Sequence, residues 1–288
     1  MRLSEIYNGK NAPVFSFEVF PPKGENPDKK MENLFCELKT LAKQKPALIS
    51  VTYGAGGSNR DTSLEIIKEL NNRLKQPVMP HFTCVCSSRE YIKKYIEEIE
   101  SLGILNILAL RGDEPQDIDV CYRDFKSALE LIEYLKNFSE LEFSVAAYPE
   151  KHPKAQSLED DISVLKKKCD LGAKVAFTQL FFKNENYYKF FDKCIKKGIN
   201  IPIIPGILPV ASFSQLSRIV ELSGTQIETK TVEYFEKYKD SKEDTIKAGI
   251  DFASEQCQKL LEFGAEGIHF YTLNKALSSC EVIKNITS

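Results

Sequence analysis

The chain has few of the residues that mark metal sites, and it has no glycine-rich nucleotide-binding turn. Its three histidines, His81, His152 and His269, lack the i,i+4 spacing of a helical zinc site, and its eight cysteines form no C-x-x-C pair. No G-x-G-x-x-G sequence occurs, which argues against a dinucleotide-binding doubly wound sheet. We therefore expect no metal site, and we expect the cysteines to be thiols in the core.

Neither the charge nor the hydropathy of the chain is typical of a protein that binds nucleic acid or membranes. The 39 Lys and Arg residues nearly balance the 41 Asp and Glu residues, so the net charge is −2 and no basic block stands out. No window approaches the ~18 consecutive apolar residues of a transmembrane helix. The opening residues, Met1–Glu5, contain no apolar signal-peptide core. We expect a cytoplasmic protein that binds neither nucleic acid nor membranes.

Short β-rich apolar runs alternate with amphipathic helical patterns along the whole chain. Most runs are continuously apolar in their first half, which is typical of strands buried on both faces. The strand starts lie about 26–39 residues apart, except for a gap of about 67 residues before the last strand. Eight such β-then-α units predict a single (β/α)8 barrel domain over residues 1–288, with extra helices before the eighth strand; a doubly wound open sheet is the alternative. The expected strands are 15–20, 47–53, 78–84, 104–111, 143–148, 174–179, 201–208 and 268–273, and the expected helices are 29–43, 61–74, 88–102, 125–138, 157–171, 185–197, 212–222, 231–239, 243–263 and 276–286.

Glu18 is the residue that the strand pattern explains least. The segment 15–20 is typical of a buried strand, and Pro21 and Pro22 end it, yet Glu18 places a carboxyl group inside it. Burying an ionised group is costly unless the group is paired or used. Burial also raises a carboxyl pKa toward the range that suits a proton donor at neutral pH. On this segment alone, a structural glutamate and a general acid are equally good interpretations.

Polar residues gather where the expected strands end. In a (β/α)8 barrel the carboxyl ends of the strands carry the active site, and here they include Thr52, His81, Arg111, Gln179 and Tyr271. Each residue also has a structural interpretation, as a satisfied core histidine, an ion-pair member or an aromatic side chain at the rim. Polar groups at every strand end of one face are hard to reconcile with structural roles alone. We therefore expect a binding cavity at this end of the barrel.

Eight sequence blocks fall in order along the chain: FSFEVFPP (15–22), SVTYGA (50–55), PHFTC (80–84), ALRGD (109–113), AAYPE (146–150), TQLFF (178–182), IIPGILPV (203–210) and HFYTLN (269–274). In order and with similar spacing, they resemble the flavin-dependent 5,10-methylenetetrahydrofolate reductases. Any single block would be weak evidence, but together they span nearly the whole chain and fall on the expected strand ends. The chain resembles the short bacterial form, a catalytic barrel without the regulatory C-terminal domain of larger members.

The resemblance implies reduction of 5,10-methylenetetrahydrofolate to 5-methyltetrahydrofolate by ping-pong hydride transfer from NADH or NADPH through FAD. It implies that Glu18 is the general acid and that Asp113 lies between flavin and pterin, where it tunes the flavin and stabilises a cationic intermediate. Substrate-binding positions are Glu18, Asp113, Gln179, Gln215, Tyr271 and Lys275. The implied FAD-binding positions are Thr52, Tyr53, Ala55, His81, Leu110, Arg111, Gly112, Asp113, Tyr122, Ala147, Tyr148, His152, Ala155, Asp161, Lys167 and Lys168.

Four positions depart from the pattern of the family. Lys167 replaces a frequent arginine, so that a bidentate phosphate contact becomes a point charge, and Lys275 replaces an arginine near the folate. Val164 stands where an asparagine is common in the flavin site, and Ile219 stands where a phenylalanine can stack on the substrates. The change at Ile219 leaves the reductant open. We expect a modest preference for NADH, and we expect a homo-oligomer. Two other classes also remain open: a flavin-free pterin-binding methyltransferase barrel and a non-catalytic folate-binding subunit.

Overall fold

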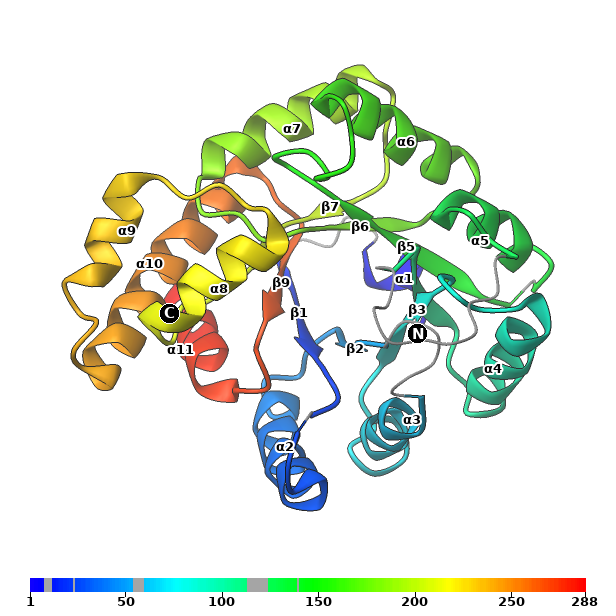
Figure 1. Ribbon diagram of the computed structural model, residues 1–288, viewed down its shortest axis with the longest axis horizontal. Helices are drawn as coiled ribbons and strands as arrows, with labels where there is room; N and C mark the ends of the chain where they lie inside the picture. Colours follow the sequence, from blue (N-terminus) through cyan, green and yellow to red (C-terminus); the bar gives the residue numbers. More distant parts are fainter. Residues whose placement is uncertain (8–11, 23, 54–59, 113–123, 139) are drawn as a thin grey trace.

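The computed structural model describes residues 1–7, 12–22, 24–53, 60–112, 124–138 and 140–288 (Figure 1). Within these residues, nine parallel strands form one sheet in the order β7-β6-β5-β4-β3-β2-β1-β9-β8, and helices surround it. The predicted barrel fold is therefore confirmed. The strands are β1 (Val14–Val19), β2 (Leu48–Val51), β3 (Val78–Thr83), β4 (Asn106–Leu110), β5 (Glu142–Ala147), β6 (Val175–Thr178), β7 (Ile203–Ile204), β8 (Gly206–Ile207) and β9 (Gly267–Tyr271).

The barrel closes at Pro205, inside the expected seventh strand. Proline has no backbone N–H to give to a sheet, so the strand is divided into β7, which pairs with β6, and β8, which pairs with β9. The Pro205 carbonyl still accepts a hydrogen bond from the His269 amide at 2.9 Å. A β-carbon on Gly206 would lie 2.3 Å from the Thr178 carbonyl oxygen, so this closure requires glycine. The pairing of this divided strand on both sides excludes the open-sheet alternative.

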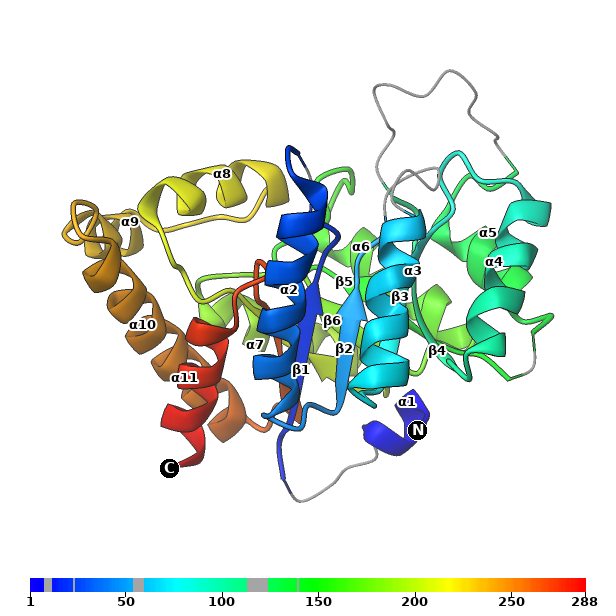
Figure 2. The same cartoon turned by 90° about the horizontal axis from the view of Figure 1, so that it is seen from below.

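The helices follow the expected ranges closely and form the outer layer. Figure 2 places α8 at the end of the barrel toward which the strands run, and α9 and α10 to one side of it. The expected extra helices before the last strand are therefore present. The helices are α1 (Leu3–Ile6), α2 (Pro27–Ala42), α3 (Arg60–Lys68), which a π-helical turn (Glu69–Arg73) continues, α4 (Arg89–Ser101), α5 (Ala128–Leu135), α6 (Leu158–Asp170), α7 (Asn184–Lys196), α8 (Phe213–Ser223), α9 (Thr229–Glu236), α10 (Lys242–Phe263) and α11 (Ala276–Thr287).

Helix α1 closes the amino-terminal end of the barrel, and the sequence patterns did not predict it. Its residues Leu3 and Ile6, with Tyr7, are buried against the deepest inward side chains of the strands. The Leu3 amide donates to Asn106 Oδ1 at 2.9 Å, and Asn106 Nδ2 donates in turn to the Met1 carbonyl. Figure 2 shows this helix at the opposite end of the barrel from α8. The barrel is therefore plugged at one end.

The cysteines are mostly free thiols, as expected. Cys84, Cys194 and Cys257 are buried thiols, whereas Cys36 is exposed. Cys86 is disulfide-bonded, so the expectation of a thiol is wrong at that position. Cys121 lies outside the described residues.

The packing of α1, which we call the plug, predicts how substitutions at this end of the barrel change stability. Leu3 is fully buried, so Leu3→Ala removes packing on all sides, and we expect the free energy of unfolding to fall by about 2–5 kcal/mol. Leu277 on α11 is 57% exposed, and Leu277→Ala is the matched control, with an expected change within about 0.5 kcal/mol. Urea unfolding followed by circular dichroism measures both. An equal loss of unfolding free energy in the two variants would contradict a stabilising role for the packing of α1.

Candidate active site

A period of two along each strand decides which side chains enter the barrel. On β1, Phe17 and Val19 pack outward in the main core between strands and helices, whereas Ser16 and Glu18 point inward. Inward side chains of alternate strands meet one another, as the 3.1 Å contact from Ser144 Oγ to Met79 Sδ demonstrates. The barrel interior is therefore built in layers, with apolar layers next to the plug and polar ones toward the carboxyl ends.

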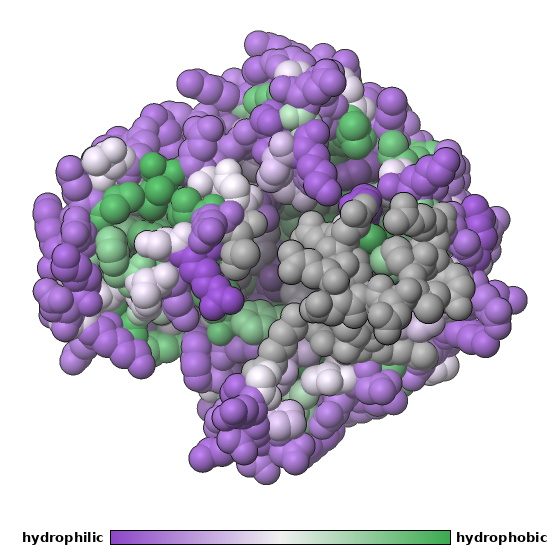
Figure 3. Space-filling model, in the orientation of Figure 1, coloured by the Kyte–Doolittle hydropathy of each residue, from purple (hydrophilic) through white to green (hydrophobic). Residues whose placement is uncertain are grey.

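A cavity of about 380 Å³ lies at the carboxyl ends of the strands, and this volume suits a small ligand. Its floor is polar, and its walls carry apolar side chains, including Ile219 from α8. Figure 3 looks onto this end of the molecule and shows apolar surface beside its centre. Seven of the predicted site residues line this one cavity: Glu18, Thr52, His81, Leu110, Tyr148, Gln179 and Tyr271.

Glu18 and His81 face each other at the cavity floor. Glu18 Oε2 lies 3.4 Å from His81 Nε2, and the Glu18 side chain is 20% exposed, toward the cavity. Burial raises the pKa of Glu18 to about 8 and lowers the pKa of His81 to about 3. At neutral pH the proton therefore lies on Glu18 and both groups are uncharged. The pair is a carboxylic acid beside a neutral imidazole and is not an ion pair.

Contacts from the end of β9 hold the strand that carries Glu18. Thr272 Oγ1 donates to the Glu18 carbonyl at 2.7 Å. Asn274 accepts from the Phe20 amide at 2.9 Å and donates to the Phe20 carbonyl at 2.7 Å, as a neighbouring strand would. Asn274 has φ of 60°, which asparagine tolerates better than most residues. The backbone at Glu18 and Phe20 is therefore fixed by side chains that directly follow the last strand.

Tyr271 and Gln179 place further polar groups at the cavity. The Tyr271 hydroxyl donates to the Thr178 carbonyl at 2.7 Å, so its oxygen remains free to accept. Burial, then the nearby Glu18, raises the pKa of Tyr271 well above its usual value, which keeps this proton in place. Gln179 accepts from the Leu180 amide at 2.9 Å, which leaves its NH2 group as a donor. The cavity therefore offers an acid, an acceptor and a donor.

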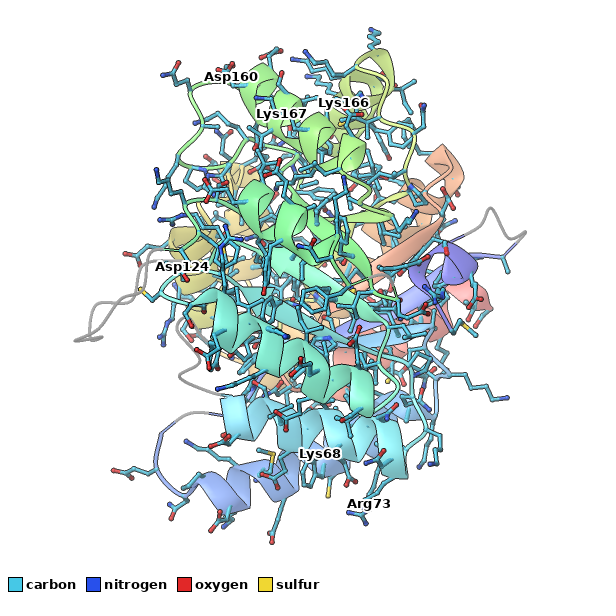
Figure 4. The ribbon with its side chains drawn as sticks, turned by 90° about the vertical axis from the view of Figure 1, so that its right-hand side faces the viewer. Lys68, Arg73, Asp124, Asp160, Lys166 and Lys167 are labelled. Atoms are coloured by element: carbon cyan, nitrogen blue, oxygen red, sulfur yellow. The ribbon has the colours of Figure 1, made fainter. Side chains whose placement is uncertain are left out.

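A second group of predicted residues lies between β5 and α6. Tyr148 packs edge-on against His152, with ring centroids 4.7 Å apart, and the His152 amide donates to Asp161 at 2.9 Å. The Ala155 carbonyl accepts from Lys151 at 2.7 Å. Lys168 reaches back to the Ala146 carbonyl at 3.4 Å, and burial lowers the pKa of its ammonium group. Lys167, labelled in Figure 4, is exposed on the same helix.

The other predicted residues do not line the cavity. Tyr53 packs among Phe82 and Tyr95, and Ala147 belongs to the outer core. Arg111 donates to the carbonyls of Lys126 and Gly112. Gln215 is exposed on α8, and Lys275 pairs with Glu37 at 3.0 Å. Three predicted residues, Ala55, Asp113 and Tyr122, lie outside the described residues.

The cavity has lining residues that the sequence argument did not select as site residues. They include Leu108, Ala146, Phe177 and His269. Each stands two positions before a residue that was selected, namely Leu110, Tyr148, Gln179 and Tyr271. Because side chains two apart on a strand share a face, this spacing was the available signal. Among the described residues, no group of three or more His, Cys, Asp and Glu side chains could hold a metal ion.

The fold and the cavity together define a (β/α)8 barrel with a buried carboxyl group of raised pKa at the floor of a cavity at the carboxyl ends of its strands. The family model described as methylenetetrahydrofolate reductase matches residues 2–287. The chain belongs to this family. No helix among the described residues has the length and apolar character to span a membrane.

Relatives in bacteria and plants match the chain over most of its length. The 5,10-methylenetetrahydrofolate reductase of Buchnera aphidicola is 40% identical over 261 residues, covering 91% of this chain and 87% of the relative. That of Escherichia coli is 36% identical, covering 91% and 86%. The methylenetetrahydrofolate reductase (NADH) 1 of Arabidopsis thaliana is 37% identical over 287 residues, but the match covers 48% of that longer protein.

Solved structures resemble the fold at low sequence identity. An uncharacterised protein from Clostridium thermocellum, described as binding two copies of 5-methyl-5,6,7,8-tetrahydrofolic acid, has a TM-score of 0.70 at 16% identity and covers 99% of this chain and 97% of its own. A dihydropteroate synthase from Coxiella burnetii in complex with pteroic acid has a TM-score of 0.52 at 11% identity, covering 96% and 93%. At these identities the likeness concerns the fold alone.

The raised pKa of Glu18 predicts how stability depends on pH. The folded protein holds this proton more tightly than the unfolded chain, so the contribution of Glu18 to stability is full below about pH 4.5 and is lost as pH rises through about 8. We expect the wild type to lose several kcal/mol relative to Glu18→Gln over this interval, since each pKa unit equals about 1.4 kcal/mol.

Urea unfolding of both proteins between pH 5 and pH 9 measures this difference. Glu133→Gln, at an exposed position on α5, is the control and should follow the wild type throughout. Parallel curves for the wild type and Glu18→Gln would show that the carboxyl group is ionised in the folded protein.

Proposed function

We propose that this chain is a flavin-dependent reductase that converts 5,10-methylenetetrahydrofolate to 5-methyltetrahydrofolate with NADH or NADPH as the reductant. The observation that carries the proposal is Glu18 at the floor of the cavity, where burial raises its pKa to about 8, in a chain of the methylenetetrahydrofolate reductase family. An acid that keeps its proton near pH 7 is what opening of the folate five-membered ring requires. The cavity size and its mixed lining support a ligand of this class.

Glu18 would deliver its proton to the folate nitrogen that leaves when the five-membered ring opens. Its apolar strand keeps the carboxyl group protonated until then, and the carboxylate left behind would recover a proton once product departs. Gln179 and Tyr271 would orient the ligand, the first through its NH2 group and the second through its hydroxyl oxygen. Asp113, outside the described residues, would stabilise the positive charge that develops on the folate.

The residues present fit a flavin. His81 Nε2 and Thr83 Oγ1 are buried and make no hydrogen bond among the described residues, so β3 offers polar atoms that a cofactor ring could satisfy. Lys168 is largely buried, and its hydrogen-bond acceptor is the neutral Ala146 carbonyl. An anionic phosphate would pair with this ammonium group more strongly than the carbonyl does. The flavin would supply the hydride transfer, and these side chains would bind and orient it.

Purified protein should contain a flavin, and that flavin should be FAD. Lys167 and Lys168 on α6, with Asp161 at the start of this helix, would receive the adenosine diphosphate portion that FMN lacks. Heat release followed by chromatography identifies the cofactor, and a visible absorbance spectrum detects it beforehand. A colourless protein would favour the methyltransferase barrel or the folate-binding subunit, and recovery of FMN alone would contradict the adenosine site.

Glu18→Gln should separate the two half-reactions. Nicotinamide-dependent flavin reduction needs no proton from this acid and should proceed at the wild-type rate. Flavin reoxidation by methylenetetrahydrofolate should slow by roughly 10²–10⁴-fold, because general acid catalysis contributes about that much. Anaerobic stopped-flow absorbance measures each half-reaction, with Glu133→Gln as the control.

If Glu18→Gln reduces the folate at the wild-type rate, Glu18 is not the general acid and its role is structural. The same instrument compares NADH with NADPH, and we expect a modest preference for NADH. If neither nucleotide bleaches the flavin, a protein electron donor becomes the better hypothesis.

A further inference from the structure

Helix α8 forms one wall of the cavity, yet few of its side chains are buried. Ile219 and Ser223 on this helix line the cavity. Among the described side chains of α8, Leu216 alone is buried, whereas α10 buries residues along its whole length. The position of this wall therefore depends on how the two ends of α8 are anchored.

The amino-terminal end of α8 is anchored by close backbone packing. Val210, three residues before the helix, lies against Gly249 of α10, and a β-carbon on Gly249 would lie 1.8 Å from the Val210 carbonyl oxygen. The backbones of these two segments therefore touch, and a side chain at position 249 would force them apart. This contact fixes where α8 begins.

The carboxyl-terminal end of α8 is anchored by hydrogen bonds to two segments that carry cavity-lining residues. The hydroxyl of Thr225, just beyond the helix, donates to the Leu180 carbonyl at 3.0 Å, and Leu180 lines the cavity. The Gln226 amide donates to Glu150 Oε2 at 2.6 Å. Glu150 lies two residues after Tyr148, which also lines the cavity. The end of α8 is therefore held by the loops that follow β5 and β6.

Glu150 joins three segments through its two oxygens. Besides the Gln226 amide on Oε2, Oε1 accepts a hydrogen bond from Asn186 Nδ2 of α7 at 2.8 Å. A carboxylate satisfies both donors, because it offers an acceptor in each direction, whereas a side-chain amide offers one acceptor and one NH2 group. The proposed chemistry does not use this side chain, and the sequence argument did not select it.

We propose that Glu150 is a positioning residue that holds the carboxyl-terminal end of α8 by accepting the Gln226 amide. It thereby sets the position of the wall formed by Ile219 and Ser223. Ser223 is directly connected to this anchor, because its hydroxyl oxygen accepts the Thr225 amide at 3.2 Å.

The anchor affects ligand binding through the fraction of time that the wall is in place. Without Glu150, water can satisfy the amide of the exposed Gln226, so α8 is displaced from the cavity more often. The apparent affinity of a ligand falls in proportion to the fraction of molecules in which the wall is in place. The weaker binding of a folate rests on the proposed function; the anchoring of α8 does not.

Hydrogen exchange of α8 in the whole, ligand-free protein tests the anchor directly. In Glu150→Ala we expect the amides of residues 213–223 to exchange about 2- to 12-fold faster, which is the converted free energy of one net hydrogen bond. The amides of α4, on the other side of the barrel (Figures 1 and 2), should exchange as in the wild type. Mass spectrometry of peptic peptides measures both. If Glu150→Ala does not fold, Glu150→Asp takes its place, because it keeps the charge and shortens the reach by one methylene group.

Glu159→Ala is the matched control. The Glu159 carboxylate pairs with Lys193 and so joins α6 to α7, in the same part of the molecule as Glu150 but without holding the end of α8. Its removal should leave the exchange of α8 unchanged.

A double variant restores the anchor with the charge on the other partner. In Glu150→Gln combined with Asn186→Asp, the new NH2 group donates to the new carboxylate, and the amide oxygen at position 150 still accepts from Gln226. The exchange of α8 in this double variant should lie closer to the wild type than to Glu150→Ala.

Steady-state kinetics separate positioning from a general loss of structure. With the proposed reductase activity, Glu150→Ala should raise KM for methylenetetrahydrofolate by up to the same 2- to 12-fold factor. It should leave kcat within about twofold, because Glu18 is untouched and the lost interaction acts on binding. A general loss of structure would instead lower kcat at an unchanged KM.

Wild-type exchange of α8 in Glu150→Ala would overturn the proposal, and so would an equal acceleration in Glu159→Ala. A double variant that exchanges as fast as Glu150→Ala, or a lowered kcat at unchanged KM, would also overturn it. The exchange measurement needs neither cofactor nor substrate. A protein that contains no flavin therefore refutes the proposed function and leaves the exchange result standing, whereas unchanged exchange refutes the anchor and leaves the activity standing.

Discussion

Closure of the barrel at Pro205 and Gly206 is the constraint on which the rest of the structure depends. Proline divides the seventh strand, so each half can pair with a different neighbour, and Gly206 lets the Thr178 carbonyl and the Tyr271 ring approach the backbone. The same Thr178 carbonyl receives the Tyr271 hydroxyl, so the seam also fixes one wall of the cavity. In an open sheet β1 and β6 would stay apart, and the polar strand ends would not surround one cavity.

A single physical cause, removal from water, sets the protonation of the cavity floor in both directions. Burial disfavours charge, so it raises the pKa of Glu18 to about 8 while it lowers those of His81 and His269 to about 3. A floor with one acid and two bases is therefore uncharged at neutral pH, without any ion pair. The acid retains a proton to give, and the imidazoles retain a lone pair each, which is a useful combination for proton transfer to a ligand.

The sequence predicted the architecture well because the barrel repeats one local pattern. Continuous apolar runs and capped amphipathic helices identified each unit, and Glu18 stood out as a charge inside such a run. Helix α1 escaped because four residues contain too little periodicity to detect. Leu108 and Phe177 were missed because an apolar residue in a buried strand does not by itself show whether it faces the cavity or a helix; only their spacing of two from Leu110 and Gln179 indicated the cavity. The division at Pro205 required knowledge of both neighbours of that strand, which one sequence does not contain.

The plug and the cavity are often treated as separate parts of such barrels, with stability at one end and chemistry at the other. Here the inward side chains connect them through direct contacts with one another. Tyr7 packs edge-on against Phe177, which lines the cavity, and its hydroxyl reaches Ser16 and through it His269. A barrel of this width is filled by a few layers of side chains, so a polar group in the lowest layers is within two contacts of the ligand. The residues of the plug therefore also support side chains that line the cavity.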